Sequence, residues 1–426
     1  MYVIEGCRGM GKTMVEKIFS SHCGQDAKAN DIVVAALDFA LLHDVNAPAA
    51  IDNFKQLGSG FGFDKDNIAV VLDHFSPCPT AISANSHKKI REFALSSGVK
   101  LYDPGEGICH QLVMEDGYIK PGSINVATDS HTLSYGALNA VGLGVGASEM
   151  AIIMASGECW FKVPETILVE LKGTMPDNVT AKDIGLKLIN MVTEKGAIYK
   201  NFEFTGDTLK SLSVDSRITI CNLMVEMGAK CAIMPGDEVL AAWLAEAGIN
   251  HEGFVNADGD ANYIAKIQID VAQMKPVVAI SPNIDDVVEV TSVKDLQLDQ
   301  VIIGSCTNGR FEDFVLTASI LQGKKVHEHL RLIIAPASRR IYKKMLQQGI
   351  MEQLLDAGAI INPPGCGPCA GLHSGLIGDG EKVLSTTNRN MKGRMGSSKG
   401  DIYISSPIVA AYSALAGYIT DGGGIK

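Results

Sequence analysis

Short apolar runs that alternate with amphipathic stretches constrain the fold of this chain more than any other feature of its sequence. Each run is followed by a loop that contains polar, Gly or Pro residues and then by a helical pattern. Buried strands that alternate with helices are typical of α/β domains with largely parallel sheets. The expected strands cover 68–72, 124–127, 167–171, 301–303, 332–335, 359–361, 383–385 and 402–404, and the expected helices include 81–97, 181–195, 209–228 and 340–349.

The length of the chain predicts more than one hydrophobic core. It has 426 residues, and single cores stop growing at about 250–300 residues. A polar interruption at 254–260 and an acidic, irregular stretch at 283–299 favour a boundary near residue 285, and a second boundary is expected near residue 125. We therefore predict three α/β domains that cover residues 1–125, 126–285 and 286–426.

Charge and composition exclude several classes of protein. The net charge is −11 and no run of Lys or Arg is longer than two residues, which disfavours binding to nucleic acid. The start of the chain has no signal-peptide pattern, and no apolar stretch approaches the roughly 18–20 residues of a membrane span. A cytoplasmic protein is expected, in which the ten cysteines are thiols or metal ligands rather than disulfides.

Three cysteines lie in Gly- and Pro-containing loops after expected strands. Cys306 lies in Gly-Ser-Cys-Thr-Asn-Gly, and Cys366 and Cys369 form a C-x2-C pair in Pro-Gly-Cys-Gly-Pro-Cys. Such thiolates can hold one metal centre while backbone N–H groups turn toward the sulfurs. Three ligands indicate a centre with an open coordination position, whereas structural zinc needs a fourth, for which His373 is the alternative.

Carboxylate–histidine pairs also follow expected strands. Ligands of α/β sheets bind at the carboxyl ends of strands, and a carboxylate that orients a histidine stabilises its protonated form, which suits a general acid. One pair alone could be ordinary strand-end polarity, but several together predict a shared site. The side chains concerned are Asp73, His74, His110, Asp129 and His131.

Two further motifs suggest ligand-binding sites, one for carboxylates and one for nucleotides. Asn388 opens a loop with Arg389 and Arg394, and arginine can bind a carboxylate through two parallel hydrogen bonds. The segment 6–13 fits the phosphate-loop pattern G-x-x-x-x-G-K-[ST]. Its preceding apolar run is short, and Asp73, the best candidate for a magnesium ligand, is followed at once by histidine. A P-loop NTPase is therefore the weaker hypothesis.

Together the motifs resemble those of the aconitase superfamily, from about residue 10 to the end of the chain. The resemblance is carried by Ala-Thr-Asp-Ser-His-Thr at 127–132, Gly-Ser-Cys-Thr-Asn at 304–308, and the segments 365–371 and 388–394. The nearest branch comprises the large subunits of 3-isopropylmalate dehydratase and archaeal-type homoaconitase. It implies that Cys306, Cys366 and Cys369 hold a [4Fe–4S] cluster whose fourth iron stays open as a Lewis acid.

The resemblance also implies roles for individual side chains. Asp73 and His74 match the pair that protonates the departing hydroxyl. His43 with Asp44 stands where aconitase proper carries Gln-Asp, a change shared with the dehydratase branch, and Cys78 is unusual at a position expected to be small. The implied catalytic residues are Asp73, His74, His110, Asp129, His131 and Glu203, with Glu203 near the iron-bound water; the implied substrate-binding residues are His43, Ser130, Asn388, Arg389 and Arg394.

The resemblance further implies a partner. Aconitases carry a swivelling fourth domain that supplies the serine base, and this sequence ends at Lys426, so a separate small subunit is expected to supply that serine in a heterodimer. The expected reaction interconverts 3- and 2-isopropylmalate in leucine biosynthesis. The alternatives are homoaconitase, citramalate or 2,3-dimethylmalate dehydratase and, in another class, an RNA- or zinc-binding regulatory protein.

Overall fold

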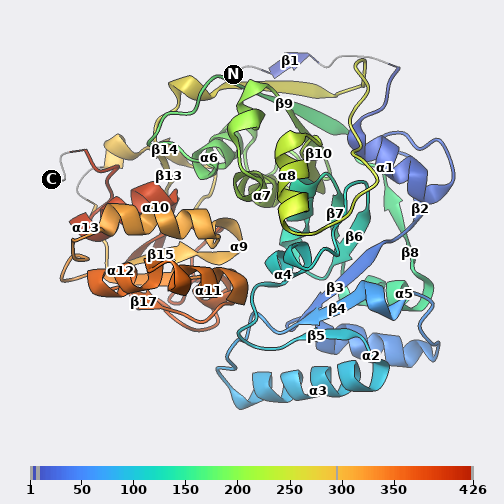
Figure 1. Cartoon of the computed structure of the whole chain (residues 1–426), viewed down its shortest axis with the longest axis horizontal. Helices are drawn as coiled ribbons and strands as arrows, with labels where there is room; N and C mark the ends of the chain where they lie inside the picture. Colours follow the sequence, from blue (N-terminus) through green and yellow to red (C-terminus); the bar gives the residue numbers. More distant parts are fainter. Residues whose placement is uncertain (1–2, 6–9, 294–295, 424–426) are drawn as a thin grey trace.

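The computed structural model describes residues 3–5, 10–293 and 296–423 (Figure 1). Its strands form one seven-stranded sheet, two five-stranded sheets and a two-stranded ribbon, and helices cover the large sheets. Most strand pairs within the three large sheets are parallel. The predicted α/β class is confirmed, with three large sheets that correspond to three α/β units.

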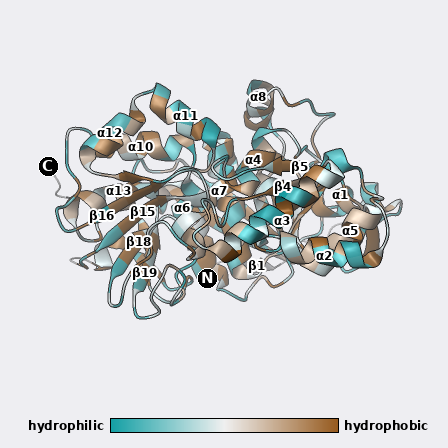
Figure 2. Cartoon of the chain, turned by 90° about the horizontal axis from the view of Figure 1, so that it is seen from below, coloured by the Kyte–Doolittle hydropathy of each residue, from teal (hydrophilic) through white to brown (hydrophobic). Residues whose placement is uncertain are grey.

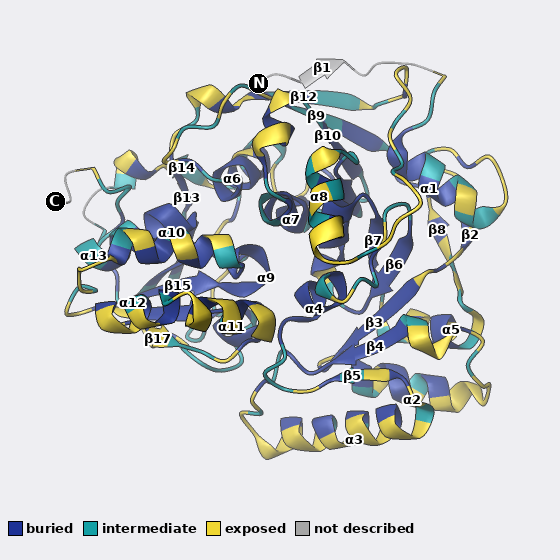
Figure 3. Cartoon of the chain, in the orientation of Figure 1, coloured by how far each residue is buried: buried dark blue, intermediate teal, exposed yellow. Residues whose placement is uncertain are grey.

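The first sheet has the strand order β5-β4-β3-β6-β7 and is parallel throughout. All residues of β3, β4 and β6 are buried, as expected for apolar strands covered on both faces. Helix α2 packs on α3 and α5, and the outward side of α3 is exposed (Figure 3). The bounds are β3 Phe39–His43, β4 Ile68–Val71, β5 Lys100–Tyr102, β6 Ile124–Ala127, β7 Val141–Gly144, α2 Ala47–Leu57, α3 Ala81–Ser97 and α5 Ala147–Ser156.

The second sheet has the order β1-β12-β9-β10-β11, in which only β1 is antiparallel. Strand β11 contacts β7, so the first and second sheets meet there. The ribbon of β2 and β8 lies beside α1. The bounds are β1 Val3–Glu5, β2 Ile32–Ala36, β8 Glu158–Lys162, β9 Thr166–Lys172, β10 Asn201–Thr205, β11 Cys231–Ile233, β12 Ala265–Asp270, α1 Met14–Cys23, α6 Ala181–Val192, α7 Val214–Leu223 and α8 Glu238–Glu246.

The third sheet has the order β14-β13-β19-β18-β15-β16-β17. Helix α6 contacts β13, β14 and β19, and α7 contacts α9, so these two helices join the second and third units. Hydrophobic residues concentrate in its strands (Figure 2). The bounds are β13 Val277–Ala279, β14 Val287–Glu289, β15 Gln300–Gly304, β16 Arg331–Ala335, β17 Ile360–Ile361, β18 Lys382–Ser385, β19 Asp401–Ser405, α9 Ser305–Asn308, α10 Phe311–Leu321, α11 Arg339–Gln347, α12 Ile350–Ala357 and α13 Pro407–Ala416.

Local signals explain where the expected elements hold and where they break. The helix expected at 81–97 is α3 at both ends, because Thr80 caps its first turn and Gly98 ends it at φ 82°. The helix expected at 209–228 is instead three pieces, since the Ser213 hydroxyl accepts from the Ser216 amide and starts α7 afresh. The pieces are η3 Asp207–Ser211, α7 and η4 Met224–Met227.

The strand order does not follow the expected domain ranges. The first sheet takes strands from both sides of residue 125, and the boundary near residue 285 falls between β13 and β14 of one sheet. The division into 1–125, 126–285 and 286–426 stays a prediction about folding units. Within the described residues, no helix has both the length and the apolar character needed to cross a membrane. The remaining short elements are α4 Cys109–Glu115, η1 Lys65–Asn67, η2 Ser130–Leu138, η5 Val271–Gln273, η6 Val290–Val293 and η7 Gly367–Ala370.

Candidate active site at the strand ends of the first and third sheets

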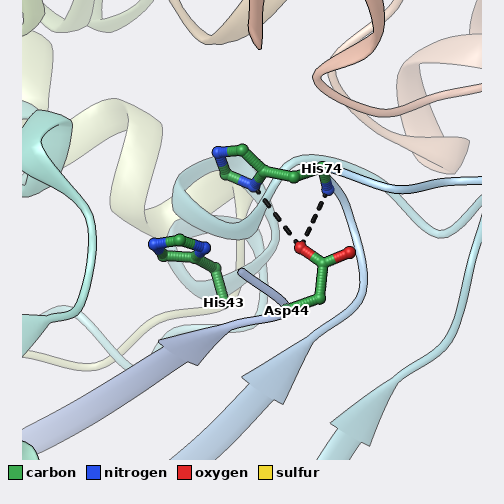
Figure 4. Close-up of side chains that lie close together, drawn as sticks. All are labelled: His43, Asp44 and His74. Carbon is green, nitrogen blue, oxygen red and sulfur yellow. Dashed lines mark hydrogen bonds and ion pairs between the residues drawn. The ribbon is translucent and has the colours of Figure 1, made fainter. Parts of the chain in front are cut away.

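Parallel strands of the first sheet end at one edge and bring polar side chains together there. The His43 and His74 rings stack with centroids 4.5 Å apart, and Asp44 accepts the backbone N–H of His74 at 3.1 Å (Figure 4). His43 itself is fixed by an Nε2 contact of 2.9 Å to the Thr128 carbonyl. This edge therefore places the carboxylate–histidine groups beside one another, as the sequence predicts.

Asp73 and His74 form a tight, buried pair. The Nδ1 of His74 lies 2.8 Å from one Asp73 oxygen, and the other oxygen accepts from the Cys109 amide at 2.8 Å. Burial disfavours the charged ring, but the Cys366 sulfur and the Asp73 carboxylate outweigh it and raise the pKa of His74 well above its ordinary value. Burial raises the pKa of the Cys366 thiol, which disfavours its charged form. The Asp73 carboxylate is therefore the main group that stabilises the protonated His74 ring. The pair keeps a proton on His74 at neutral pH.

Asp129 organises the second group of histidines. One of its oxygens lies 2.8 Å from His110 Nε2 and accepts the His131 amide at 2.7 Å. Burial opposes ionisation of Asp129, but the hydrogen bonds from His110 and His131 hold its pKa well below the ordinary value. The His74 Nε2 lies 3.8 Å from the other oxygen, so the two expected pairs form one connected cluster.

Glu226, which no sequence motif singles out, joins this cluster to the arginine loop. One Glu226 oxygen lies 3.3 Å from His131 Nε2, and the Nε of Arg389 donates to both oxygens at 3.0 Å. Burial works against the charge of Glu226, yet His131 and Arg389 lower its pKa. Asn222, four residues earlier, also reaches the site, and the i,i+4 spacing of two polar residues was the available signal.

Glu203 lies apart from this cluster. It is fully buried in β10, where its carboxylate accepts from the Val15 amide at 3.1 Å and from the Tyr263 hydroxyl at 3.2 Å. Burial raises the pKa of Glu203 to about 7. The glutamate that contacts His131 and Arg389 is Glu226, and the structure does not bring Glu203 into this cluster.

The three cysteines of the motifs converge from two loops of the third unit. They are 8%, 8% and 6% exposed for Cys306, Cys366 and Cys369, and all three are free thiols. Cys366 and Cys369 share one turn, in which the Cys369 amide donates to the Cys366 carbonyl at 3.2 Å. The 388–394 loop contacts Cys306 through Asn388 and packs on this turn at Gly371, so it joins the two cysteine loops. Gly304 makes the turn that presents Cys306: its φ is 146°, and a Cβ there would lie 2.1 Å from the Ala335 carbonyl oxygen.

The surroundings of the sulfurs fit a metal centre. The Nδ2 groups of Asn222 and Asn388 point to the Cys306 sulfur at 3.3 and 3.8 Å. Amide donors of this kind offset thiolate charge. The Cys366 sulfur, a ring nitrogen of His74 and an oxygen of Asp73 lie within 4.8 Å of one another. Of the three cysteines, Cys366 is therefore the one that lies next to the acid pair.

His373 does not offer a fourth ligand. Its Nδ1 contacts the Ser374 hydroxyl at 2.5 Å, and its Nε2 contacts the His74 carbonyl at 2.9 Å. Both ring nitrogens are thus occupied by protein partners. The donor set is three thiols, which favours a centre with an open position over structural zinc.

The expected substrate-binding arginines differ in their partners. Arg389 also donates to the Ser130 hydroxyl at 3.0 Å. The Nε of Arg394 is buried, and no acceptor within the described residues satisfies it. The loop of Arg394 packs on the cysteine loop, because a Cβ on Gly371 would lie 2.2 Å from the Arg394 carbonyl oxygen. An unsatisfied buried guanidinium nitrogen on a loop that packs on the cysteine loop is a donor without a protein partner.

A buried lysine, which no sequence motif singles out either, supports the loop before Asn388. The Nζ of Lys182 donates to the carbonyls of Thr386 and Thr387 at 2.8 and 2.5 Å. Burial lowers the pKa of Lys182 to about 7, against the pull of Cys306 and Cys369. This amino group fixes the turn that directs Asn388 toward the Cys306 sulfur.

Other sequence features lie elsewhere. Residues 6–9 of the phosphate-loop pattern fall outside the described residues, and the Lys12 ammonium pairs with Asp26 and donates to the Ser20 hydroxyl at 2.7 Å. Thr13 caps α1 with Glu16 rather than facing an open loop. A cavity of about 930 Å³ between α6 and β12 contains none of the expected site residues.

Comparison with known proteins agrees with this geometry. The model of the aconitase family (aconitate hydratase) matches residues 16–298 and 290–417. The chain is 43% identical to the 3-isopropylmalate dehydratase large subunit 1 of Methanopyrus kandleri and 45% identical to the large subunit 2 of Archaeoglobus fulgidus, in each case over 97% of this chain and 99% of the relative. The crystal structure of Thermococcus kodakaraensis aconitase X in its holo-form has a TM-score of 0.50 at 13% identity and covers 91% of this chain and 87% of its own.

The chain belongs to the aconitase family. The resemblance seen in the motifs is confirmed, and with it the predicted hydro-lyase class, to which the dehydratase relatives belong. Membership implies an iron–sulfur centre, and the three convergent thiols with their amide donors are residues that fit one.

Proposed function

We propose that this chain is the large subunit of a [4Fe–4S] hydro-lyase that interconverts 3- and 2-isopropylmalate by removal and return of water. One observation carries the proposal: the Cys366 sulfur lies within 4.8 Å of the Asp73–His74 pair. This proximity supports a reaction in which a proton and a metal centre act on the same hydroxyl. The names of full-length relatives favour isopropylmalate over homoaconitate, citramalate or 2,3-dimethylmalate.

The residues of this chain divide the chemistry between them. Cys306, Cys366 and Cys369 would hold the cluster, and when bound it supplies a Lewis acid for the substrate hydroxyl. The Nδ1–H of His74 donates to Asp73, so His74 Nε2 is the atom that holds the transferable proton. His74 gives that proton to the departing hydroxyl and takes it back during hydration.

The substrate carboxylates need cationic partners. Arg389 is held in place by Glu226 and faces the exposed Ser130 hydroxyl, and the buried Nε of Arg394 is free of protein acceptors in the described structure. Burial strengthens such charge-assisted contacts because water is excluded. We assign substrate-carboxylate binding to these two arginines, with His43 and Asn388 bordering the same space.

The base for the carbon-bound proton is proposed to come from a small partner subunit. Ser406 caps α13 and the Ser405 hydroxyl bonds the Ser406 carbonyl at 3.4 Å, and both are fully buried. These serines are therefore engaged in the fold. The relatives are named as large subunits, which supports a second chain that completes the site and excludes water.

The proposal is tested by reconstitution under anaerobic conditions. The cluster-loaded chain is assayed with each of the four substrates, alone and with increasing amounts of the small subunit encoded with it. We expect turnover of 3-isopropylmalate only with the partner, saturating at a fixed ratio. Full turnover by the chain alone would place the base in this sequence, and preference for another substrate would reassign the specificity.

A further inference from the structure

Beside the site, a cysteine, a histidine and a carboxylate form a chain of hydrogen bonds that the proposed reaction does not use. The Cys78 sulfur lies 3.0 Å from His87 Nδ1, and His87 Nε2 lies 2.8 Å from an Asp44 oxygen. His87 and Asp44 are 0% and 1% exposed. A nucleophile next to a base that is oriented by a third, buried group is the arrangement of an activated thiol.

The contact with Asp44 determines which ring nitrogen of His87 carries the proton. The carboxylate accepts the amides of His74 and Phe75 at 3.1 and 2.9 Å. A carboxylate oxygen that already takes backbone N–H groups acts as the acceptor, so His87 Nε2 is the donor in its contact with Asp44. The Nδ1 lone pair is then directed at Cys78 and can take the thiol proton.

The chain contains matched cysteines for comparison. Cys78, Cys23 and Cys159 are all partly exposed. The Cys23 sulfur contacts only the carbonyls of Ser20 and Gln25 among its hydrogen-bond partners in the described structure, at 3.9 and 3.6 Å, and Cys159 similarly contacts the Trp160 carbonyl at 3.7 Å. Carbonyl oxygens cannot accept a proton to release a thiolate. Exposure is therefore similar, and the adjacent base distinguishes Cys78.

Cys78 also lies just before the start of a long helix. It lies two residues before Thr80, which caps the 17-residue helix α3. The positive end of a helix stabilises a nearby negative charge. Pro77, Pro79 and Thr80 around it are exposed, so small reagents can reach the sulfur.

We propose that Cys78 is a base-activated thiol and a site of covalent modification by hydroperoxides and small electrophiles. His87 takes the thiol proton, and the sulfur attacks one oxygen of hydrogen peroxide. An S–O bond forms as the O–O bond breaks, and the departing hydroxide takes the proton from His87. Cys–SH and H₂O₂ thus become Cys–SOH and H₂O, with sulfur oxidised and peroxide reduced by two electrons.

Modification at Cys78 has a path to the acid pair. The Asp44 carboxylate that orients His87 also accepts the His74 amide and lies 3.6 Å from His74 Nδ1 (Figure 4). A group added to the sulfur must displace its contact with His87 and change the balance of hydrogen bonds at Asp44. This consequence for turnover rests on the proposed function, whereas the reactivity of Cys78 does not.

The test compares cysteines within one protein. The cluster-loaded, full-length chain is treated with limiting iodoacetamide at pH 7, and the rate at each cysteine is read by peptide mass mapping. We expect Cys78 to react roughly tenfold or more faster than Cys23 and Cys159, because only its thiolate is released by a base. A rate no higher than that of these two cysteines would overturn the proposal.

Two further measurements separate the base from simple exposure. His87→Gln should bring the rate at Cys78 down to that of Cys23, and an unchanged rate in the folded variant would also overturn the proposal. If this variant does not fold, peroxide with a sulfenic-acid trap on the wild-type chain decides: the trap should mark Cys78 before Cys23 and Cys159. Cys78→Ser should fold, bind the cluster and lose the peptide label, and alkylation should lower turnover in wild type but not in this variant.

Discussion

The two halves of the site differ in how many of their polar groups have hydrogen-bond partners within the protein. In the half from the first sheet, each carboxylate and ring is held by protein partners: His74 by Asp73, His110 and His131 by Asp129. In the half from the third unit, three thiols converge and the buried Nε of Arg394 has no acceptor among the described residues. The proton-handling half is preorganised, and the other half is completed by what it binds.

Glu226 connects the two halves, and its contrast with Glu203 shows what the connection does. Both carboxyl groups are buried. The neighbours His131 and Arg389 lower the pKa of Glu226, whereas burial raises that of Glu203 to about 7. Surroundings rather than residue type decide which glutamate carries charge at neutral pH.

The largest effect is expected in the half completed by binding. Cys306→Ser, Cys366→Ser or Cys369→Ser should abolish the iron–sulfur spectrum and all turnover, because a hydroxyl is a poor ligand for the soft cluster iron. Iron and sulfide analysis with electronic spectra measures this. Cys231→Ser, which changes a fully buried thiol of β11, is the control and should retain the cluster. Retention of the cluster in all three variants would move the centre elsewhere.

The preorganised half should lose chemistry and keep the cluster. His74→Asn removes the proton at Nε2, and turnover should fall by about 10²–10⁴, the usual range for loss of a general acid. Steady-state kinetics at saturating partner measures the loss, with the cluster spectrum as the control for folding. Turnover within a few-fold of wild type would show that the hydroxyl receives its proton from another group.

The connection itself is tested by a pair of isosteric changes. Glu226→Gln removes the charge that orients His131 and Arg389, and turnover should fall by about 10–100-fold, as for other supporting groups of metal sites. Glu203→Gln changes another buried glutamate, outside the cluster, and should leave kcat and KM within about twofold. Equal losses in the two variants would contradict the different placements of these residues.

Much of the fold and half of the site follow from sequence, for local reasons. The expected strands at 68–72 and 124–127 match β4 and β6, because apolar runs of that length can be buried only in a covered sheet. The end of each apolar run also predicts the end of its strand, so the position of the carboxylate–histidine pair that follows could be predicted too. The cysteine loops carried their own Gly and Pro signals.

The rest depends on packing between distant elements. Glu226 belongs to a short 3₁₀ turn after α7, and its i,i+4 spacing from Asn222 does not indicate that η2, which contains His131, and the arginine loop meet there. Glu203 follows Asn201 in a strand with an Asn-Phe-Glu-Phe pattern that resembled a site motif but faces α1. Lys182 and the Cys78–His87–Asp44 chain join residues 9 to 205 positions apart. Such contacts leave no periodic trace in one sequence.

A smaller effect is expected where charge is kept and geometry is lost. Arg389→Lys retains the cation but cannot reach Glu226 and Ser130 together as the guanidinium does. We expect a rise in KM of roughly tenfold, about 1.4 kcal/mol of binding free energy. Initial-rate measurements over a range of isopropylmalate concentration give this value. Arg340→Lys, at an exposed site pairing with Asp116, is the matched control and should be silent. Wild-type KM in Arg389→Lys would remove this arginine from the binding of carboxylates.

The last prediction concerns stability and uses the contrast between the two glutamates. Burial raises the pKa of Glu203 from 4.5 to about 7, so the folded state keeps a proton that the unfolded state releases. The contribution of this group to the free energy of unfolding is therefore full below pH 4.5 and declines as the pH rises toward 7. At 1.36 kcal/mol per pKa unit the decline is about 3 kcal/mol. The pKa of Glu226 is lowered, so its contribution is present above pH 4.5 and is lost on acidification below it.

Urea unfolding of the cluster-loaded chain at a series of pH values, compared with Glu203→Gln and Glu226→Gln, measures both. Between pH 5 and pH 8, the free energy of unfolding of Glu203→Gln should rise relative to that of wild type. As the pH falls below 5, the free energy of unfolding of Glu226→Gln should rise relative to that of wild type. Curves that run parallel to wild type in both variants would mean that the two carboxyl groups titrate alike and that their surroundings do not set their charge.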